Sequence, residues 1–234
     1  MKLRFIMILA FNILNAEIQL NFKNDPYGTH QPVLYEIANM TTGPIIEFGS
    51  GDNSTGLMHE ICKKSKRLLI TVDDDLEWIN KFSQKYLGDG YEKDNSGWHK
   101  IFFVPGRKGE SPEHWIKFLD NFDLLKNTSF DLCLIDQAPF LGRTETIMRV
   151  KDKIKYIILH DCDYFATREF ESFGKTITPI DAKNSIPGIY DFSNTFKYFK
   201  VFFPSKPWPG ASGPPTLLGS NFESNIPDID YNKY

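Results

Sequence analysis

The chain has 234 residues, of which 41% are hydrophobic and 24% charged, and this is typical of one globular domain with a sizeable core and room for appendages. A net charge of −3 provides no broad basic surface, so the composition argues against a nucleic-acid partner. Three cysteines without paired spacing argue against a disulfide framework.

Residues 1–16 differ in composition from the rest of the chain. Lys2 and Arg4 precede an apolar run over 5–14, and the small Ala16 precedes a polar stretch. The run has the length of a signal-peptide core and is shorter than the roughly 20 residues that span a bilayer. We therefore predict a signal segment at 1–16, entry into the secretory pathway and no stable membrane span. The alternative is a buried first element of a cytoplasmic domain.

Short apolar runs then alternate with helical patterns. Apolar residues at helical spacing over 33–38 predict a first helix, and further helical faces separate the later runs. Strands that are apolar on both faces and separated by helices predict an α/β fold, with a doubly wound, mostly parallel sheet covered by helices on both sides. The predicted strands are 44–48, 67–72, 100–104, 130–135 and 156–159.

The pattern weakens after residue 165. Residues 195–203 are compatible with a late strand that is aromatic on both faces, whereas 204–215 are too rich in Pro and Gly for the interior of an element. We therefore place the α/β domain at 17–203, followed by a Pro/Gly-rich loop and polar tail at 204–234.

Acids or glycines follow each of the predicted strands. In an open parallel α/β sheet, ligands bind at the carboxyl ends of the strands, so these residues should gather at one edge. In chain order they are Glu47 with the turn Gly49-Ser50-Gly51, then Asp73, Pro105-Gly106, Asp136, and His160-Asp161.

The glycine turn after the first strand is the strongest local signal. Gly49 and Gly51 allow close approach of the backbone to a ligand, and the following helix begins with free N–H groups. A dinucleotide fingerprint requires a third glycine where this chain has Ser54. Glu47 suits a cationic ligand rather than a pyrophosphate, and Asp73 is placed to accept hydrogen bonds from ribose hydroxyls. The alternative is a tight connection without a ligand.

The segments "EFGSGDNST" and "VDDDLEW" resemble the cofactor site of class I S-adenosylmethionine-dependent methyltransferases. The resemblance implies a seven-stranded sheet, with the methionine part of the cofactor near the glycine turn and its ribose held by Asp73. We interpret Asp74 and Asp75, which follow Asp73, as helix-capping acids. The residues expected to line the turn are Glu47, Gly49, Ser50, Gly51 and Ser54.

Two later segments, "DLCLIDQAPFLGRTETI" and "YIILHDCDYF", resemble those of bacterial sugar and macrolide O-methyltransferases and of plant glucuronoxylan O-methyltransferases. The resemblance covers about residues 44–165 at the level of motifs. It implies methyl transfer to oxygen on a saccharide or another small hydroxyl-bearing acceptor. It leaves the oligomeric state open.

Three acids near the ends of the fourth and fifth strands predict a metal site. Asp136, Asp161 and Asp163 would share a hard cation such as Mg²⁺, which would bind and orient the substrate hydroxyl. His160, with Asp136, would act as general base. Arg143 suits a substrate carboxylate through a bidentate pair. The alternatives are that Asp136 binds the cofactor amine or caps an element, and that His160 and Arg143 are structural.

Trp208 lies among prolines and glycines. It is interpreted either as an aromatic platform for a sugar ring or as part of a rigid surface loop.

Two other functions fit parts of the sequence. Asn39, Asn53 and Asn127 begin glycosylation sequons, and a glycan on Asn53 would block the glycine turn, which favours a secreted methyltransferase-like protein that binds without catalysis. A dinucleotide-dependent oxidoreductase is opposed by Glu47 and Ser54.

Overall fold

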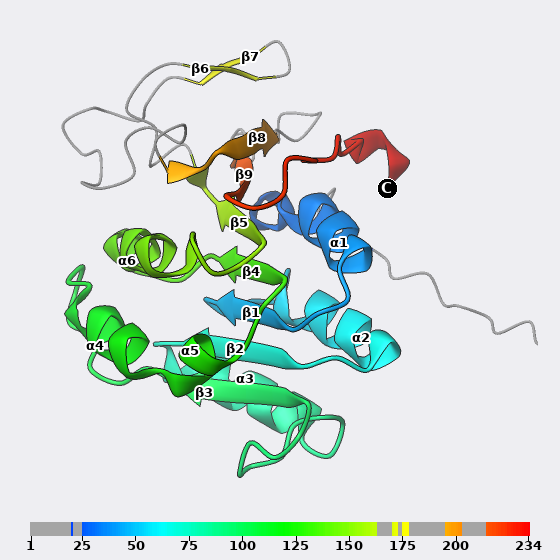
Figure 1. Cartoon of the computed structure of the whole chain (residues 1–234). Helices are drawn as coiled ribbons and strands as arrows, with labels where there is room; N and C mark the ends of the chain where they lie inside the picture. Colours follow the sequence, from blue (N-terminus) through cyan, green and yellow to red (C-terminus); the bar gives the residue numbers. More distant parts are fainter. Residues whose placement is uncertain (1–19, 21–24, 163–169, 173–174, 178–194, 203–213) are drawn as a thin grey trace, which may run out of the picture.

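The computed structural model describes residues 20, 25–162, 170–172, 175–177, 195–202 and 214–234. They form a seven-stranded sheet in the order β3-β2-β1-β4-β5-β9-β8 (Figure 1) and a separate two-stranded sheet. The seven strands are β1 Ile45–Phe48, β2 Leu69–Asp73, β3 His99–Phe103, β4 Leu132–Ile135, β5 Tyr156–His160, β8 Tyr198–Phe202 and β9 Thr216–Ser220. The small sheet pairs β6 Phe170–Ser172 with β7 Lys175–Ile177.

The predicted α/β sheet is confirmed, and so is its expected number of seven strands. The five strands β1 to β5 are parallel, whereas β9 runs antiparallel to both β5 and β8, so the sheet is mixed. In β1, β2, β4 and β5 every residue is buried, because helices cover both faces.

The helices divide between the two faces of the sheet. The face that carries Ile45 and Ile158 packs against α1 Gln31–Met40 and α2 Thr55–Ser65, and on the same side α3 Leu76–Tyr86 packs against Ile101. The opposite face carries Ile46 and Ile157. It packs against α4 Glu113–Asn121, α5 Asp123–Asn127 and α6 Phe140–Val150.

The segment 204–234, expected to be a loop and polar tail outside the domain, contains a strand of the sheet. β9 lies between β5 and β8, and all five of its residues are buried. Farther on, Ile226, Ile229 and Tyr231 pack with the α1 face of the core, and the 3-10 helix η3 Tyr231–Lys233 follows. The domain boundary at residue 203 is therefore too early.

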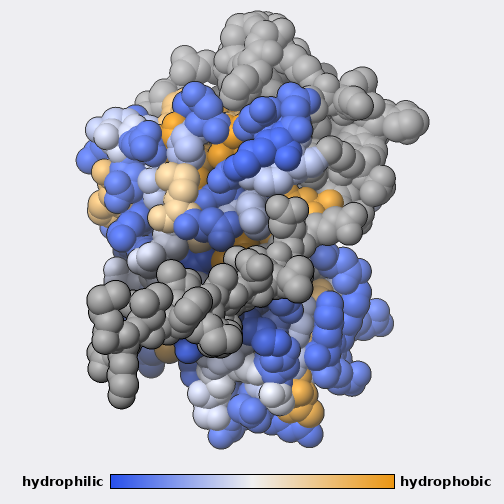
Figure 2. Space-filling view, turned by 90° about the vertical axis from the view of Figure 1, so that its right-hand side faces the viewer, coloured by the Kyte–Doolittle hydropathy of each residue, from blue (hydrophilic) through white to orange (hydrophobic). Residues whose placement is uncertain are grey.

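The side of the molecule on which α1 and α2 lie has a mostly hydrophilic described surface with scattered apolar residues (Figure 2). Among the described residues, no helix is both long and apolar enough to cross a bilayer. Residues 1–16, Asp163 and Trp208 lie outside the described residues, so the signal segment, the third predicted metal ligand and the aromatic platform stay predictions.

Candidate functional site

The glycine turn between β1 and α2 lies directly against the end of β4. Gly49 has a φ of +92°, and a Cβ there would collide with the backbone of Asp136 and Gln137. At Gly51, by contrast, an added Cβ would meet nothing closer than Ser54 Oγ at 3.8 Å. The turn is thus tightly packed at its first glycine and open at its second, where a ligand can approach.

Asp73, the last residue of β2, ties the turn to the neighbouring strand. Its Oδ2 accepts hydrogen bonds from Ser50 N at 2.5 Å and Ser50 Oγ at 2.6 Å, and its Oδ1 accepts one from Asp75 N at 2.8 Å. A carboxylate offers about four acceptor positions, so one is left for a ligand hydroxyl. Burial raises the pKa of Asp73 to about 6, against the lowering effect of these bonds.

Glu47 was expected to face a cationic ligand, but its carboxyl group is enclosed by hydroxyl donors. Ser54 Oγ donates to it at 2.5 Å, Thr71 Oγ1 at 2.9 Å, and Thr55 Oγ1 at 3.0 and 3.1 Å to its two oxygens. The residue is completely buried, and burial raises its pKa to about 8. Glu47 and Ser54 therefore stabilise the glycine turn instead of facing a ligand, since their polar groups already bond to each other.

The acids after Asp73 have different roles. Asp75 caps α3 as expected, because its Oδ1 accepts from Glu77 N at 2.8 Å and Trp78 N at 3.4 Å. Asp74 does not cap the helix. It is buried, and its Oδ2 lies 2.6 Å from His114 Nε2 and accepts from Trp115 Nε1 at 3.2 Å, which joins the end of β2 to α4.

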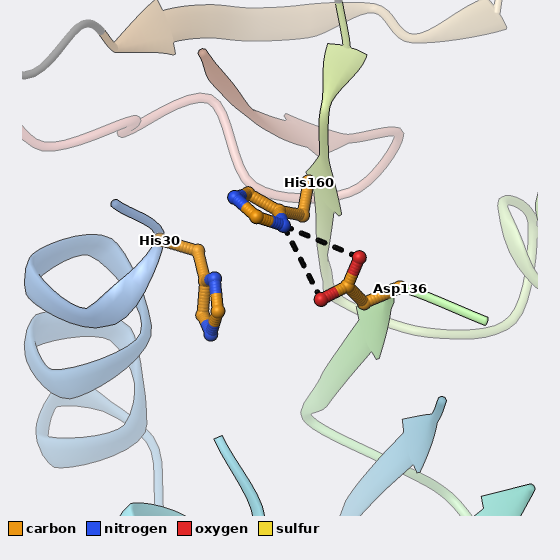
Figure 3. Close-up of side chains that lie close together, drawn as sticks. All are labelled: His30, Asp136 and His160. Atoms are coloured by element: carbon orange, nitrogen blue, oxygen red, sulfur yellow. Dashed lines mark hydrogen bonds and ion pairs between the residues drawn. The ribbon is translucent and has the colours of Figure 1, made fainter. Parts of the chain in front are cut away.

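Asp136 and His160 meet at the ends of β4 and β5, as the order of the strands predicts. His160 Nδ1 lies 3.2 Å from both carboxylate oxygens of Asp136 (Figure 3). Burial alone would raise the pKa of Asp136, but the charges of His160 and Arg143 outweigh it and hold that pKa well below its usual range. Conversely, burial would lower the pKa of His160, and Asp136 raises it. The pair thus favours a carboxylate beside an imidazolium.

Arg143 was expected to bind a substrate carboxylate, and the structure contradicts this. Its guanidinium donates to the backbone carbonyls of Gln137 at 2.8 Å, His160 at 2.9 Å and Asp136 at 3.1 Å. It also pairs with Asp161 Oδ2 at 3.0 Å and Asp136 Oδ1 at 2.9 Å. These contacts use the five N–H donors of the side chain, which is 7% exposed. Arg143 therefore links β4, α6 and β5 and has no donor left to bind a ligand.

This arrangement also corrects the expected metal set of Asp136, Asp161 and Asp163. The first two carboxylates share Arg143, whose single charge offsets one of their two, and Asp163 lies outside the described residues. The expected cluster of unpaired acids for a hard cation such as Mg²⁺ is therefore not formed by the described residues.

Instead, His30 joins the pair, and the sequence analysis missed it. His30 immediately precedes α1, and its ring centroid lies 4.5 Å from that of His160. Burial, followed by the charge of His160, lowers the pKa of His30 to about 3, so its ring is neutral. No motif surrounds this residue, and its place depends on how α1 packs against β4 and β5, so the sequence carried no local signal for it.

No protein-family model matches the sequence, and neither does any curated protein sequence. Solved structures do match. One is the O-methyltransferase TomG from Streptomyces achromogenes, involved in tomaymycin synthesis and solved in complex with SAM; at 12% identity it matches over 82% of this chain and 79% of its own, with a TM-score of 0.54. Another is the methyltransferase domain of bacterial CtHen1; at 6% identity it matches over 84% of this chain and 100% of its own, with a TM-score of 0.50. At such identities the likeness concerns the fold alone. The chain therefore has the Rossmann-like fold of class I methyltransferases, with a seven-stranded mixed sheet.

Proposed function

We propose that this protein is an S-adenosylmethionine-dependent methyltransferase that methylates a hydroxyl oxygen. The observation that carries the proposal is the placement of two different groups at one sheet edge. The glycine turn with Asp73 lies at the ends of β1 and β2, and the pair Asp136–His160 lies at the ends of the adjacent β4 and β5.

The residues at the first of these places fit the cofactor. Asp73 keeps one acceptor position for a ribose hydroxyl, and the backbone at Gly51 faces open space. Ser50 is already held by Asp73, so the turn is ordered before a ligand arrives, which reduces the entropic cost of binding. Bound there, S-adenosylmethionine supplies an electrophilic methyl group.

The second place supplies a base. Asp136 makes the imidazole of His160 more basic and fixes the direction of its Nδ1. In its neutral form, His160 would accept the proton of the acceptor hydroxyl at Nδ1. The hydroxyl oxygen would take the methyl group as the carbon–sulfur bond of the sulfonium breaks, which leaves the demethylated thioether. Asp136 then stabilises the imidazolium that results. Arg143 keeps the two strand ends, and so the two side chains, at a fixed separation.

The acceptor class rests on the resemblance of residues 130–165 to saccharide and macrolide O-methyltransferases. We infer a small hydroxyl-bearing acceptor such as a saccharide. Localisation in the secretory pathway rests on residues 1–16 alone.

The test is calorimetric titration of the full chain with S-adenosylmethionine and with its demethylated product. We expect micromolar binding that Asp73→Ala abolishes. Asp75→Asn, which alters only the cap of α3, should retain binding. His160→Ala should bind the cofactor and lose methyl transfer to hydroxyl acceptors. If the wild-type chain binds neither compound, the proposal is wrong, and a binding protein that retains the fold becomes the better account.

A further inference from the structure

We propose that His30, Asp136 and His160 bind a divalent transition-metal ion. Each offers one ligand atom, and these atoms lie within 4.8 Å of one another, a grouping found once among the described residues. Figure 3 shows the three side chains extending toward a shared space from the start of α1 and the ends of β4 and β5. The set differs from the three acids expected from the sequence and shares only Asp136 with it.

The tautomer of His160 is fixed by Thr29. The Thr29 hydroxyl donates its one hydrogen to the carbonyl of Pro214 at 2.6 Å, so it can only accept from His160 Nε2 at 3.1 Å. Nε2 therefore carries a hydrogen, and the neutral ring presents the bare lone pair of Nδ1 to Asp136. That nitrogen must hold either a proton or another cation, because a lone pair facing a carboxylate at 3.2 Å is repulsive. A ligating histidine in proteins is typically oriented by such a bond from its other nitrogen.

His30 supplies a second, independent indication of a ligand. The residue is 1% exposed, and neither ring nitrogen forms a hydrogen bond of normal geometry, although the backbone of Asn53 lies nearby. Leaving a buried polar group without a partner is unfavourable, because the group has lost its bonds to water. The neutral imidazole of His30, beside Asp136 and His160, thus has a nitrogen lone pair that is available to coordinate a metal ion.

Asp136 completes the site. Arg143 occupies its Oδ1 at 2.9 Å and leaves Oδ2, and the side chain keeps 23% exposure, so the site opens on this side. Ligand atoms about 2.0–2.2 Å from a common ion lie about 3.4 Å apart at a tetrahedral angle. The ligand atoms here lie within 4.8 Å of one another, so the most distant pair needs to close by at most about 1.4 Å, which small side-chain rotations can supply.

The ligand types select the ion. Two imidazoles and one carboxylate favour Zn²⁺, Co²⁺, Ni²⁺, Fe²⁺ or Mn²⁺ over Mg²⁺, which prefers oxygen ligands. Three protein ligands also leave positions for water or an alcohol oxygen, whose pKa the ion would lower. What the ion does rests on the proposed methyl transfer, since it would take over the activation of the acceptor from His160. Its binding does not depend on that function.

The experiment is titration of the chelator-treated full chain with Co²⁺, followed by its visible absorption bands, which report nitrogen ligation. We expect saturable binding of one ion. His30→Gln and His160→Gln should weaken it more than 100-fold. Thr29→Val, which removes the orienting bond to His160 together with the bond to the Pro214 carbonyl, should weaken it by about 10- to 100-fold. The control His59→Gln replaces another buried histidine and should leave binding unchanged.

Parallel calorimetry with S-adenosylmethionine separates the two proposals. A His30→Gln protein that binds the cofactor but not Co²⁺ is folded and supports the metal site. Wild-type protein that binds Co²⁺ but no cofactor keeps the metal site and rejects the methyltransferase. Absence of saturable Co²⁺ binding in folded wild-type protein, or equal binding in all variants, overturns the metal site.

Discussion

Two pairs of buried histidines lie on the same side of the sheet, and they behave differently. His59 and His99 face each other with their Nδ1 atoms 3.0 Å apart, while His30 and His160 lie edge to face at the ends of α1 and β5. All four side chains are buried. The comparison isolates what a neighbouring carboxylate does to a buried imidazole.

The pair His59–His99 bonds mainly to uncharged neighbours inside the core, and the carboxylate nearest to it, that of Asp89, is half-exposed and lies 3.5 Å from His59 Nε2. His99 Nε2 lies 3.1 Å from Thr71 Oγ1, and His59 stacks on Tyr86 at 3.8 Å between ring centroids. Burial, followed by the charge of His59, lowers the pKa of His99 to about 3. In the other pair, Asp136 raises the pKa of His160. The largely buried Asp136 thus preserves the charge of His160, whereas the half-exposed Asp89 does not outweigh the burial of His59, whose pKa is lowered.

The largest expected effect on stability comes from replacing Arg143, which supports the charged pair Asp136–His160. Arg143→Met would leave Asp136 and Asp161 without their common cation and would remove the hydrogen bonds that the side chain donates to three backbone carbonyls. We expect a loss of about 3–5 kcal/mol in the free energy of unfolding, measured by urea denaturation. Arg143→Lys should restore little of it, because an ammonium cannot reproduce the fork of the guanidinium.

Arg149→Met in the same helix is the matched control. Arg149 pairs with Asp120 and Glu145 near the surface, where solvent screens the charges. A loss of stability as large as that of Arg143→Met would contradict the special role of the buried arginine.

Breaking the neutral pair should affect stability and spare the proposed site. His99→Leu removes the partner of His59 Nδ1 and of the Thr71 hydroxyl. We expect the free energy of unfolding to fall by about 1–3 kcal/mol. Cofactor and Co²⁺ affinities, measured by calorimetry, should stay unchanged, and a selective loss of Co²⁺ binding would place this pair in the metal site instead.

Glu47, which Thr71 links to the neutral pair, should make stability depend on pH. Burial raises its pKa from the ordinary value of 4.5 to about 8, so the folded protein binds this proton more tightly than the unfolded chain. The resulting stabilisation is complete below the unfolded pKa and is lost as the pH rises through 8.

Glu47→Gln should flatten this dependence, by up to about 1.4 kcal/mol per pH unit between pH 5 and 8. Thermal denaturation at several pH values measures it. The raised pKa of Asp73 makes stability depend on pH in the same direction. Asp73 is present in both proteins, so its contribution is common to both profiles. Parallel pH profiles for the two proteins would mean that Glu47 is ionised in the folded state.

The smallest effect on stability is expected at Asp89, beside the neutral pair His59–His99. Asp89 lies 3.5 Å from His59 Nε2 and 2.8 Å from Lys63 Nζ, at a half-exposed position. Asp89→Asn should leave the melting temperature within experimental scatter, because water screens this contact. A large drop would show that His59 is charged, which would remove the distinction between the two pairs.

Local patterns were sufficient to predict the first five strands and the acids at their ends. Gly49 and Asp73 could be read from the sequence because a turn and a strand end need only neighbouring residues. Arg143 was misread, since its five contacts come from residues at the ends of β4 and β5 and become visible only when α6 packs against the face of the sheet. β9 was missed because five buried residues between a Pro-rich stretch and a polar tail give little periodicity.

The support of the histidine cluster has a kinetic consequence. Thr29, which orients His160, is itself held by Pro214 and by the hydroxyl of Tyr231, which donates to the Thr29 carbonyl at 2.8 Å across 202 residues of sequence. Contacts between such distant segments form slowly, after local structure has collapsed. We therefore expect β1 to β5 to assemble first and the cluster to be completed as the C-terminal segment docks. A ligand bound there would mainly slow unfolding rather than speed folding, because its contacts are absent from the transition state.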